Sequence, residues 1–147
     1  MTTLDVQRDA RGIVTCWIDN ADRRNALNDS MLATLADVME EACPQAARAV
    51  FVRGRHNIFC SGRDLAELDA GEDEDEATLT RRIAPALRLA RAVRHCAVPT
   101  VAVIDGKAVG LGVALAIWCD MALDRMARAS PFPKPVPASR RRLLPSR

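Results

Sequence analysis

The feature that most constrains the fold is a strand, a small-residue turn and an apolar helix that follow one another between residues 99 and 120. Apolar and β-branched residues from Thr100 to Ile104 are typical of a buried strand, which the pair Asp105-Gly106 ends. The turn 108–112, of sequence AVGLG, then leads into a helix from about Val113. Free backbone N–H groups remain at such a helix N-terminus, and the macrodipole there favours negative charge. We therefore expect this turn to stabilise developing negative charge.

A second glycine turn lies upstream, at residues 58–65. Its apolar start, Ile58-Phe59, is expected to anchor the segment in the core. The small residues Ser61-Gly62 leave the backbone uncovered, so a ligand can approach the N–H of Arg63 closely. Asp64 can cap a short helix that follows. Because glycine before a helix cap is also common in purely structural turns, this segment alone does not define a site.

The remaining elements alternate between strands and helices, which predicts an α/β fold. Strands are expected at Ile13 to Ile18, after a hairpin turn, and at Ala49 to Arg53. Asn28 or Asp29 caps a first helix, and a longer helix runs from Ala77 or Thr78 to about His95. An acidic run at 72–76 is expected to be a solvated loop, with a cation site as the alternative. One face of the longer helix is expected to be buried: Leu79, Ile83, Ala86, Leu87, Ala90 and Val93.

Length and composition favour one domain in a reducing compartment. The chain has 147 residues, a polar start and no apolar run long enough to span a bilayer, so we expect a cytoplasmic protein without a membrane partner. The cysteines form no C-x-x-C pair and are expected to be small buried apolar residues rather than disulfides or metal ligands. They are Cys16, Cys43, Cys60, Cys96 and Cys119.

The last 25 residues, 123–147, differ in composition from the rest of the chain. They hold five of the eight prolines, seven basic residues and one acidic residue, without a periodic apolar pattern or a strand. Such a composition is typical of disorder. A nucleic-acid or anionic-membrane partner would rest only on Arg140-Arg141-Arg142, which no aromatic residues accompany, so none is expected. The sequence therefore predicts a core over 1–122 and a Pro/Arg-rich tail over 123–147.

Several segments together resemble the crotonase family of enoyl-CoA hydratases and isomerases. They are NALN at 25–28, FCSGRDL at 59–65, VPTVAVIDG at 98–106, AVGLG at 108–112 and Cys119-Asp120. Their order and spacing match the family over roughly residues 10–122. The resemblance implies a crotonase-like spiral of β-β-α units, here truncated at its C-terminus. The missing continuation, in a chain rich in Arg and poor in Lys, leads us to expect that the tail is disordered or arises from a frameshift.

The resemblance also implies a substrate and a site. Family members bind an acyl-CoA thioester between two backbone N–H groups, which stabilise an enolate-like intermediate. Carried onto this sequence, the two donors are the N–H groups of Arg63 and Leu111. No metal and no separate cofactor are expected, since coenzyme A is part of the substrate. The resemblance also implies a homo-oligomer, because the intact family usually forms trimers or hexamers. The substrate-binding positions would be Arg24, Ala26, Cys60, Ser61, Gly62, Asp64 and Gly110.

The catalytic carboxylates of the related hydratases are absent from the matching positions. One glutamate of those enzymes corresponds to Ala114 and a second to about Lys134. Hydration needs groups that deprotonate water and protonate carbon. Three hypotheses follow: a hydratase or isomerase of acyl-CoA metabolism, a catalytically inactive acyl-CoA-binding or subunit-association module, and a gene remnant that does not fold.

Overall fold

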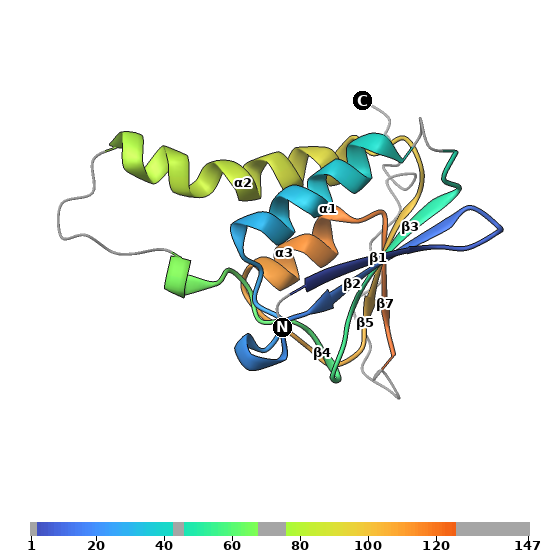
Figure 1. Cartoon of the computed structure of the whole chain (residues 1–147), viewed down its shortest axis with the longest axis horizontal. Helices are drawn as coiled ribbons and strands as arrows, with labels where there is room; N and C mark the ends of the chain where they lie inside the picture. Colours follow the sequence, from blue (N-terminus) through green and yellow to red (C-terminus); the bar gives the residue numbers. More distant parts are fainter. Residues whose placement is uncertain (1–2, 43–45, 68–75, 126–147) are drawn as a thin grey trace, which may run out of the picture.

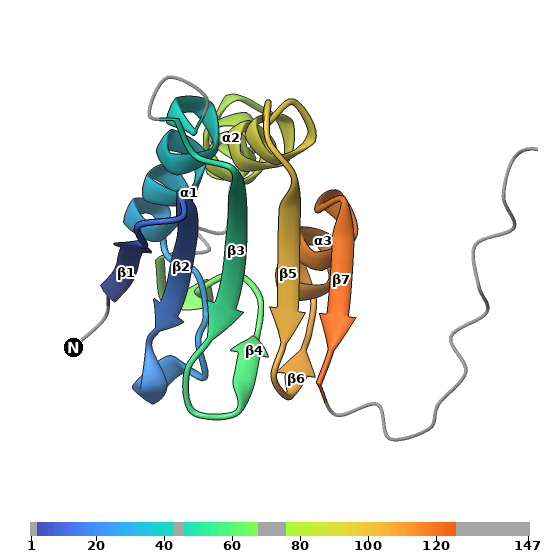
Figure 2. The same ribbon diagram turned by 90° about the vertical axis from the view of Figure 1, so that its right-hand side faces the viewer.

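Three helices cover one face of a five-stranded sheet in the computed structural model (Figures 1 and 2), which describes residues 3–42, 46–67 and 76–125. The strand order is β1-β2-β3-β5-β7; β1 and β2 form an antiparallel hairpin and the other pairings are parallel. The five strands are β1 (Thr3–Arg8), β2 (Ile13–Asp19), β3 (Ala49–Gly54), β5 (Thr100–Ile104) and β7 (Met121–Asp124). The predicted α/β class is confirmed.

The remaining elements are a small second sheet and five helical segments. The small sheet pairs β4 (Ile58–Cys60) with β6 (Lys107–Ala108) in parallel. The helices are α1 (Asp29–Glu41), α2 (Glu76–Arg94) and α3 (Leu111–Trp118), with short 3₁₀ turns η1 (Ala21–Arg23) and η2 (Leu65–Glu67). The core lies between the large sheet and the helices, where side chains such as Val52, Leu32 and Leu115 are fully buried.

Local sequence signals locate several elements correctly. The predicted strand at Thr100–Ile104 is β5, and Asn28 is the N-cap of α1, where its side-chain oxygen accepts from the Met31 N–H at 2.9 Å. Among the described cysteines, Cys16, Cys60 and Cys119 are buried and unpaired, while Cys96 is half-buried. Cys43 lies outside the described residues.

The predicted buried face of α2 is wrong over its N-terminal half. Three residues of that face are about half exposed, with exposed fractions of 50% for Leu79, 45% for Ile83 and 51% for Leu87. Figure 1 shows the reason: the N-terminal half of α2 extends past α1, so only its later turns lie over the core. The buried residues of α2 are accordingly Leu89, Ala92 and Val93.

Three boundaries differ from the prediction. α3 begins at Leu111, two residues early, because Gly110 already has the N-cap position. β7 pairs in parallel with β5 and continues to Asp124, two residues beyond the boundary predicted at 122. The prediction that no strand follows this boundary was therefore wrong. Glu76 begins α2, while the rest of the acidic run and the tail from 126 lie outside the described residues. The division into core and tail stays a prediction.

No helix in the described ranges is long and apolar enough to cross a membrane.

Candidate functional site

The two glycine turns predicted from the sequence lie against each other. The pairing of β4 with β6 brings them together, and the Val109 N–H donates to the Cys60 carbonyl at 2.9 Å. Gly62 packs on the second turn: a methyl group on its Cα would lie 3.2 Å from the Val109 oxygen and 3.4 Å from the Leu111 nitrogen. Arg63 and Leu111, which are 48 positions apart in the sequence, therefore occupy neighbouring turns.

The backbone N–H groups of Arg63 and Leu111 have no intramolecular acceptor among the described residues. On either side of Arg63 the backbone is paired: the Leu27 N–H donates to Gly62 at 2.8 Å, and the Asp64 N–H donates to Leu27 at 2.9 Å. In α3 the N–H groups after Leu111 donate to the carbonyls of Val109 and Gly110. Two free donors on adjacent turns form a site that can bind an oxygen with negative charge, which accepts from both.

Glycine is required at three positions of the two turns, by backbone conformation at two of them and by lack of space at the third. Gly62 has φ +112° and Gly110 has φ +53° with ψ −120°, which are conformations that other residues adopt only with strain. Gly112 is limited by space instead, because a methyl group on its Cα would lie 2.5 Å from the Cys60 oxygen. The sequence pattern G-x-G at 110–112 therefore reflects one conformational and one steric demand.

The side chains at the first turn have structural contacts. Burial raises the pKa of the Cys60 thiol to about 11, so this thiol is protonated at neutral pH. The Asp64 carboxylate accepts from the Ala66 N–H at 3.0 Å and caps η2, as the sequence predicts. The Ser61 hydroxyl donates to the Arg23 carbonyl at 3.0 Å, which joins this turn to the segment after β2.

The segment 20–27 lies beside the first turn and is held there by a buried amide network that sequence reasoning missed. The Asn25 amide donates to the carbonyls of Arg55 at 2.9 Å and Ile58 at 2.7 Å, and its oxygen accepts from the Asn20 N–H at 2.9 Å. Ala26 is consequently buried, whereas Arg24 is exposed. The two contacts with Arg55 and Ile58 join residues 30 and 33 positions apart, for which the sequence carries no local signal.

The position of the first predicted catalytic glutamate carries no ionisable group. Ala114 lies in the first turn of α3, three residues after Leu111, and is half-buried. Lys134 lies outside the described residues. In the described part of the chain no group of three or more His, Cys, Asp or Glu side chains is arranged to hold a metal ion.

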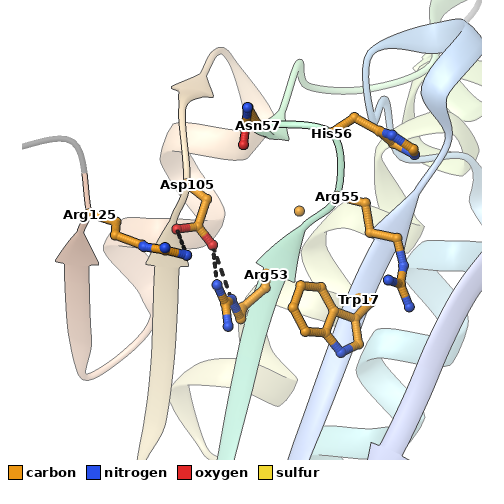
Figure 3. Close-up of a pocket in the computed structure, with 8 residues that line it drawn as sticks. Trp17, Arg53, Arg55, His56, Asn57, Asp105 and Arg125 are labelled. Carbon is orange, nitrogen blue, oxygen red and sulfur yellow. Dashed lines mark hydrogen bonds and ion pairs between the residues drawn. The ribbon is translucent and has the colours of Figure 1, made fainter.

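A separate pocket of about 340 Å³ lies at the carboxyl ends of β2, β3 and β5 (Figure 3). The Arg53 guanidinium forms an ion pair with Asp105 and lies 4.6 Å from the centre of the Trp17 ring, while that of Arg55 lies 4.9 Å from it. Arg125 approaches the other Asp105 oxygen at 3.6 Å. None of the predicted site residues lines this pocket. Trp17 and Arg53 are neighbours because β2 pairs with β3 in a register that sets them opposite each other. The sequence does not specify this register.

Comparison with known proteins assigns the chain to a family. The family model described as Enoyl-CoA hydratase/isomerase matches residues 8–135, which extends past the boundary predicted at 122. The chain is 31% identical over 127 residues to the enoyl-CoA hydratase domain-containing protein 3, mitochondrial, of Rattus norvegicus. That alignment covers 84% of this chain and 42% of the rat protein.

Solved structures agree with this assignment. An enoyl-CoA hydratase/carnithine racemase from Magnetospirillum magneticum superposes with a TM-score of 0.73 at 30% identity, covering 84% of this chain and 46% of that one. An enoyl-CoA hydratase from Mycobacterium avium subsp. paratuberculosis K-10 gives a TM-score of 0.69 at 31% identity, covering 82% and 46%.

The chain belongs to the enoyl-CoA hydratase/isomerase family and has the crotonase fold. It spans less than half the length of each of these three relatives. The family resemblance predicted from the short motifs is therefore confirmed, and its restriction to the N-terminal part of the family stays a prediction.

Proposed function

We propose that the chain binds an acyl-CoA thioester and stabilises the negative charge on its carbonyl oxygen, as an enzyme of the hydratase/isomerase type. The observation that carries this proposal is the pair of backbone N–H groups at Arg63 and Leu111, which lie on adjacent turns and have no acceptor among the residues that the structure describes. Family membership supports acyl-CoA as the ligand class.

The chemistry follows from charge development on the thioester. When a proton leaves the α-carbon, or a nucleophile adds at the β-carbon, electron density moves onto the carbonyl oxygen. Two fixed donors stabilise that oxygen more than the neutral carbonyl, so they lower the barrier. The loss of one such donor costs about 10²–10³ in rate in comparable enzymes. Since the donors are backbone groups, Leu111 supplies one as well as glycine would.

The remaining positions have supporting roles in this proposal. Cys60, Ser61, Gly62 and Asp64 shape the first turn, Gly110 shapes the second, and Arg24 and Ala26 border the coenzyme A moiety. No cofactor beyond coenzyme A itself is needed. Because Ala114 supplies no carboxylate, isomerisation or another enolate reaction is favoured over hydration. The homo-oligomer and the cytoplasmic location stay predictions.

Calorimetric titration of the full chain with butyryl-CoA and with coenzyme A tests the proposal. We expect tighter binding of the thioester, because only its carbonyl reaches the two N–H groups. Gly110→Val distorts the second turn and should abolish that preference. Gly12→Val is the matched control, since Gly12 has φ +80° but lies in the β1–β2 hairpin.

Three outcomes are informative. Equal affinity for butyryl-CoA and coenzyme A, or an unaffected Gly110→Val variant, would contradict the proposed site. Turnover of crotonyl-CoA or of its β,γ-unsaturated isomer would establish the enzyme. Thioester binding without either turnover would keep the binding site and identify the chain as the inactive acyl-CoA-binding module.

A further inference from the structure

The Arg63 side chain leaves the candidate site and reaches the start of α1. Its guanidinium donates to the Asp29 carboxylate and forms an ion pair with it. The Arg63 side chain is 12% exposed and that of Asp29 is 57% exposed. The Arg63 Nε is buried without a hydrogen-bond partner in the described part of the chain. A guanidinium this desolvated depends on its remaining partner, so the Asp29 contact constrains it strongly.

The same two segments are also joined through the backbone. Leu27 forms a parallel bridge with Arg63 through the carbonyl of Gly62 and the N–H of Asp64. In such a bridge the N–H of the central residue points away from the neighbouring strand. The bridge therefore directs the Arg63 N–H away from Leu27 and leaves it free for a ligand.

The Arg63 N–H shares a peptide plane with the Gly62 carbonyl, and the 2.8 Å hydrogen bond from the Leu27 N–H sets the orientation of that plane. On the N-terminal side of this plane stands Gly62, whose φ is +112° and whose backbone rotates more freely than that of any other residue. The Asp29 contact at the far end of the Arg63 side chain adds a second restraint, on the C-terminal side of the same plane.

We infer that Asp29 is a positioning residue of the candidate site: by holding the Arg63 side chain, it keeps the Arg63 N–H directed at the thioester carbonyl. This inference rests on the proposed function. Asp29, in the first turn of α1, would thus affect how strongly the site polarises the thioester carbonyl. The alternative is a purely structural role, in which the Asp29 carboxylate stabilises α1 through the helix macrodipole. In that case, loss of the carboxylate would lower the stability of the helix without changing the polarisation of a bound thioester.

Ultraviolet difference spectroscopy with cinnamoyl-CoA separates the two roles. The absorption band of this conjugated thioester moves to longer wavelength when donors polarise its carbonyl oxygen. The full-length wild-type chain should shift the band on binding. Asp29→Asn removes the charge of the partner and should reduce the shift, whereas Asp29→Glu keeps the carboxylate and should restore most of it.

Asp37→Asn is the matched control. Asp37 lies on the same helix, eight residues after Asp29, in an exposed ion pair with Arg88 at 2.6 Å. This variant should keep the full spectral shift. Thermal unfolding of all variants reports on helix stability, and the double variant Asp29→Asn with Arg63→Ala should lose no more of the shift than Arg63→Ala alone.

The outcomes distinguish this inference from the proposed function. A full shift in Asp29→Asn, with or without a lower melting temperature, would overturn the positioning role and leave the function standing. A wild-type chain that binds no cinnamoyl-CoA, or binds it without a shift, would overturn both. A reduced shift in Asp29→Asn together with its recovery in Asp29→Glu supports the inference.

Discussion

Two regions of this fold differ in what holds them together: backbone atoms in one and side chains in the other. The turns at 60–64 and 108–112 meet through backbone atoms, and their close approach depends on glycine. The cluster at the carboxyl ends of β2, β3 and β5 is made by side chains, with the Trp17 ring beside Arg53 and the Arg53–Asp105 ion pair (Figure 3). The comparison teaches that a site whose donors are backbone groups depends on the close approach that glycine permits, whereas a side-chain cluster depends on each of its charged partners.

The largest effect is expected from Gly112→Ala at the backbone-built turns. Its methyl group would lie 2.5 Å from the Cys60 oxygen, so the backbone must move, at a cost of about 3 kcal/mol. Urea unfolding measures this cost, and butyryl-CoA binding should be lost with it. The matched variant Gly12→Ala has its closest contact at 3.2 Å and should cost less. Equal losses in the two variants would show that the close approach is not what requires glycine.

Asp105→Ala should give the next largest effect, on stability alone. It leaves Arg53, whose side chain is 26% exposed, without its carboxylate partner, and we expect a loss of about 2 kcal/mol. Butyryl-CoA affinity should not change, because none of the proposed site residues lines this pocket. If Asp105→Ala weakened thioester binding while remaining folded, the two regions would be coupled rather than separate.

A smaller, pH-dependent effect is expected where Asp120 joins the start of β5. The Thr100 N–H and hydroxyl, each at 2.8 Å from the carboxylate, hold the pKa of Asp120 below its ordinary value. A lowered pKa means that the ionised group adds stability above the unfolded pKa of about 3.9, and that this stability is lost as pH falls.

Comparison with Asp120→Asn isolates this contribution. The difference in unfolding free energy between wild type and variant should be constant above about pH 5 and shrink below about pH 4. A difference that does not vary with pH would mean that ionisation of Asp120 does not contribute. Asp9, whose pKa is also lowered, is present in both proteins and cancels from the comparison.

The smallest expected effect is the labelling of the buried cysteines of the folded protein by thiol reagents. Burial raises the pKa of Cys16 and Cys119 to about 12 and that of Cys60 to about 11, so these thiols should react with iodoacetamide only as fast as the protein unfolds. Mass spectrometry of the labelled chain measures this, with Cys96 as the half-buried comparison. Rapid labelling of Cys60 in the folded protein would show that the first turn opens.

Local signals account for the parts of the fold that sequence reasoning predicted. The β-branched run at β5 and the Asn28 cap depend on neighbours within a few positions, so the sequence shows them directly. The buried face of α2 depends on how much of α2 lies alongside α1. The exposed Leu79 shows that helical spacing alone does not decide which side is covered.

The candidate site divides in the same way. The two glycine turns could be predicted because glycine and small residues mark them in the sequence. The partners that hold them could not, since the contacts of Arg63 with Asp29 and of Asn25 with Ile58 join positions more than 30 residues apart. Only the strand pairing brings these groups together.

The most direct test of the proposed site is the amide nuclear magnetic resonance spectrum of the ¹⁵N-labelled chain during titration with butyryl-CoA. If the thioester oxygen binds between the two turns, the amide protons of Arg63 and Leu111 move together to lower field as they gain a strong acceptor. The amide of Gly12, in the distant hairpin, stays in place. Binding of butyryl-CoA that leaves the Arg63 and Leu111 resonances unmoved would contradict the account.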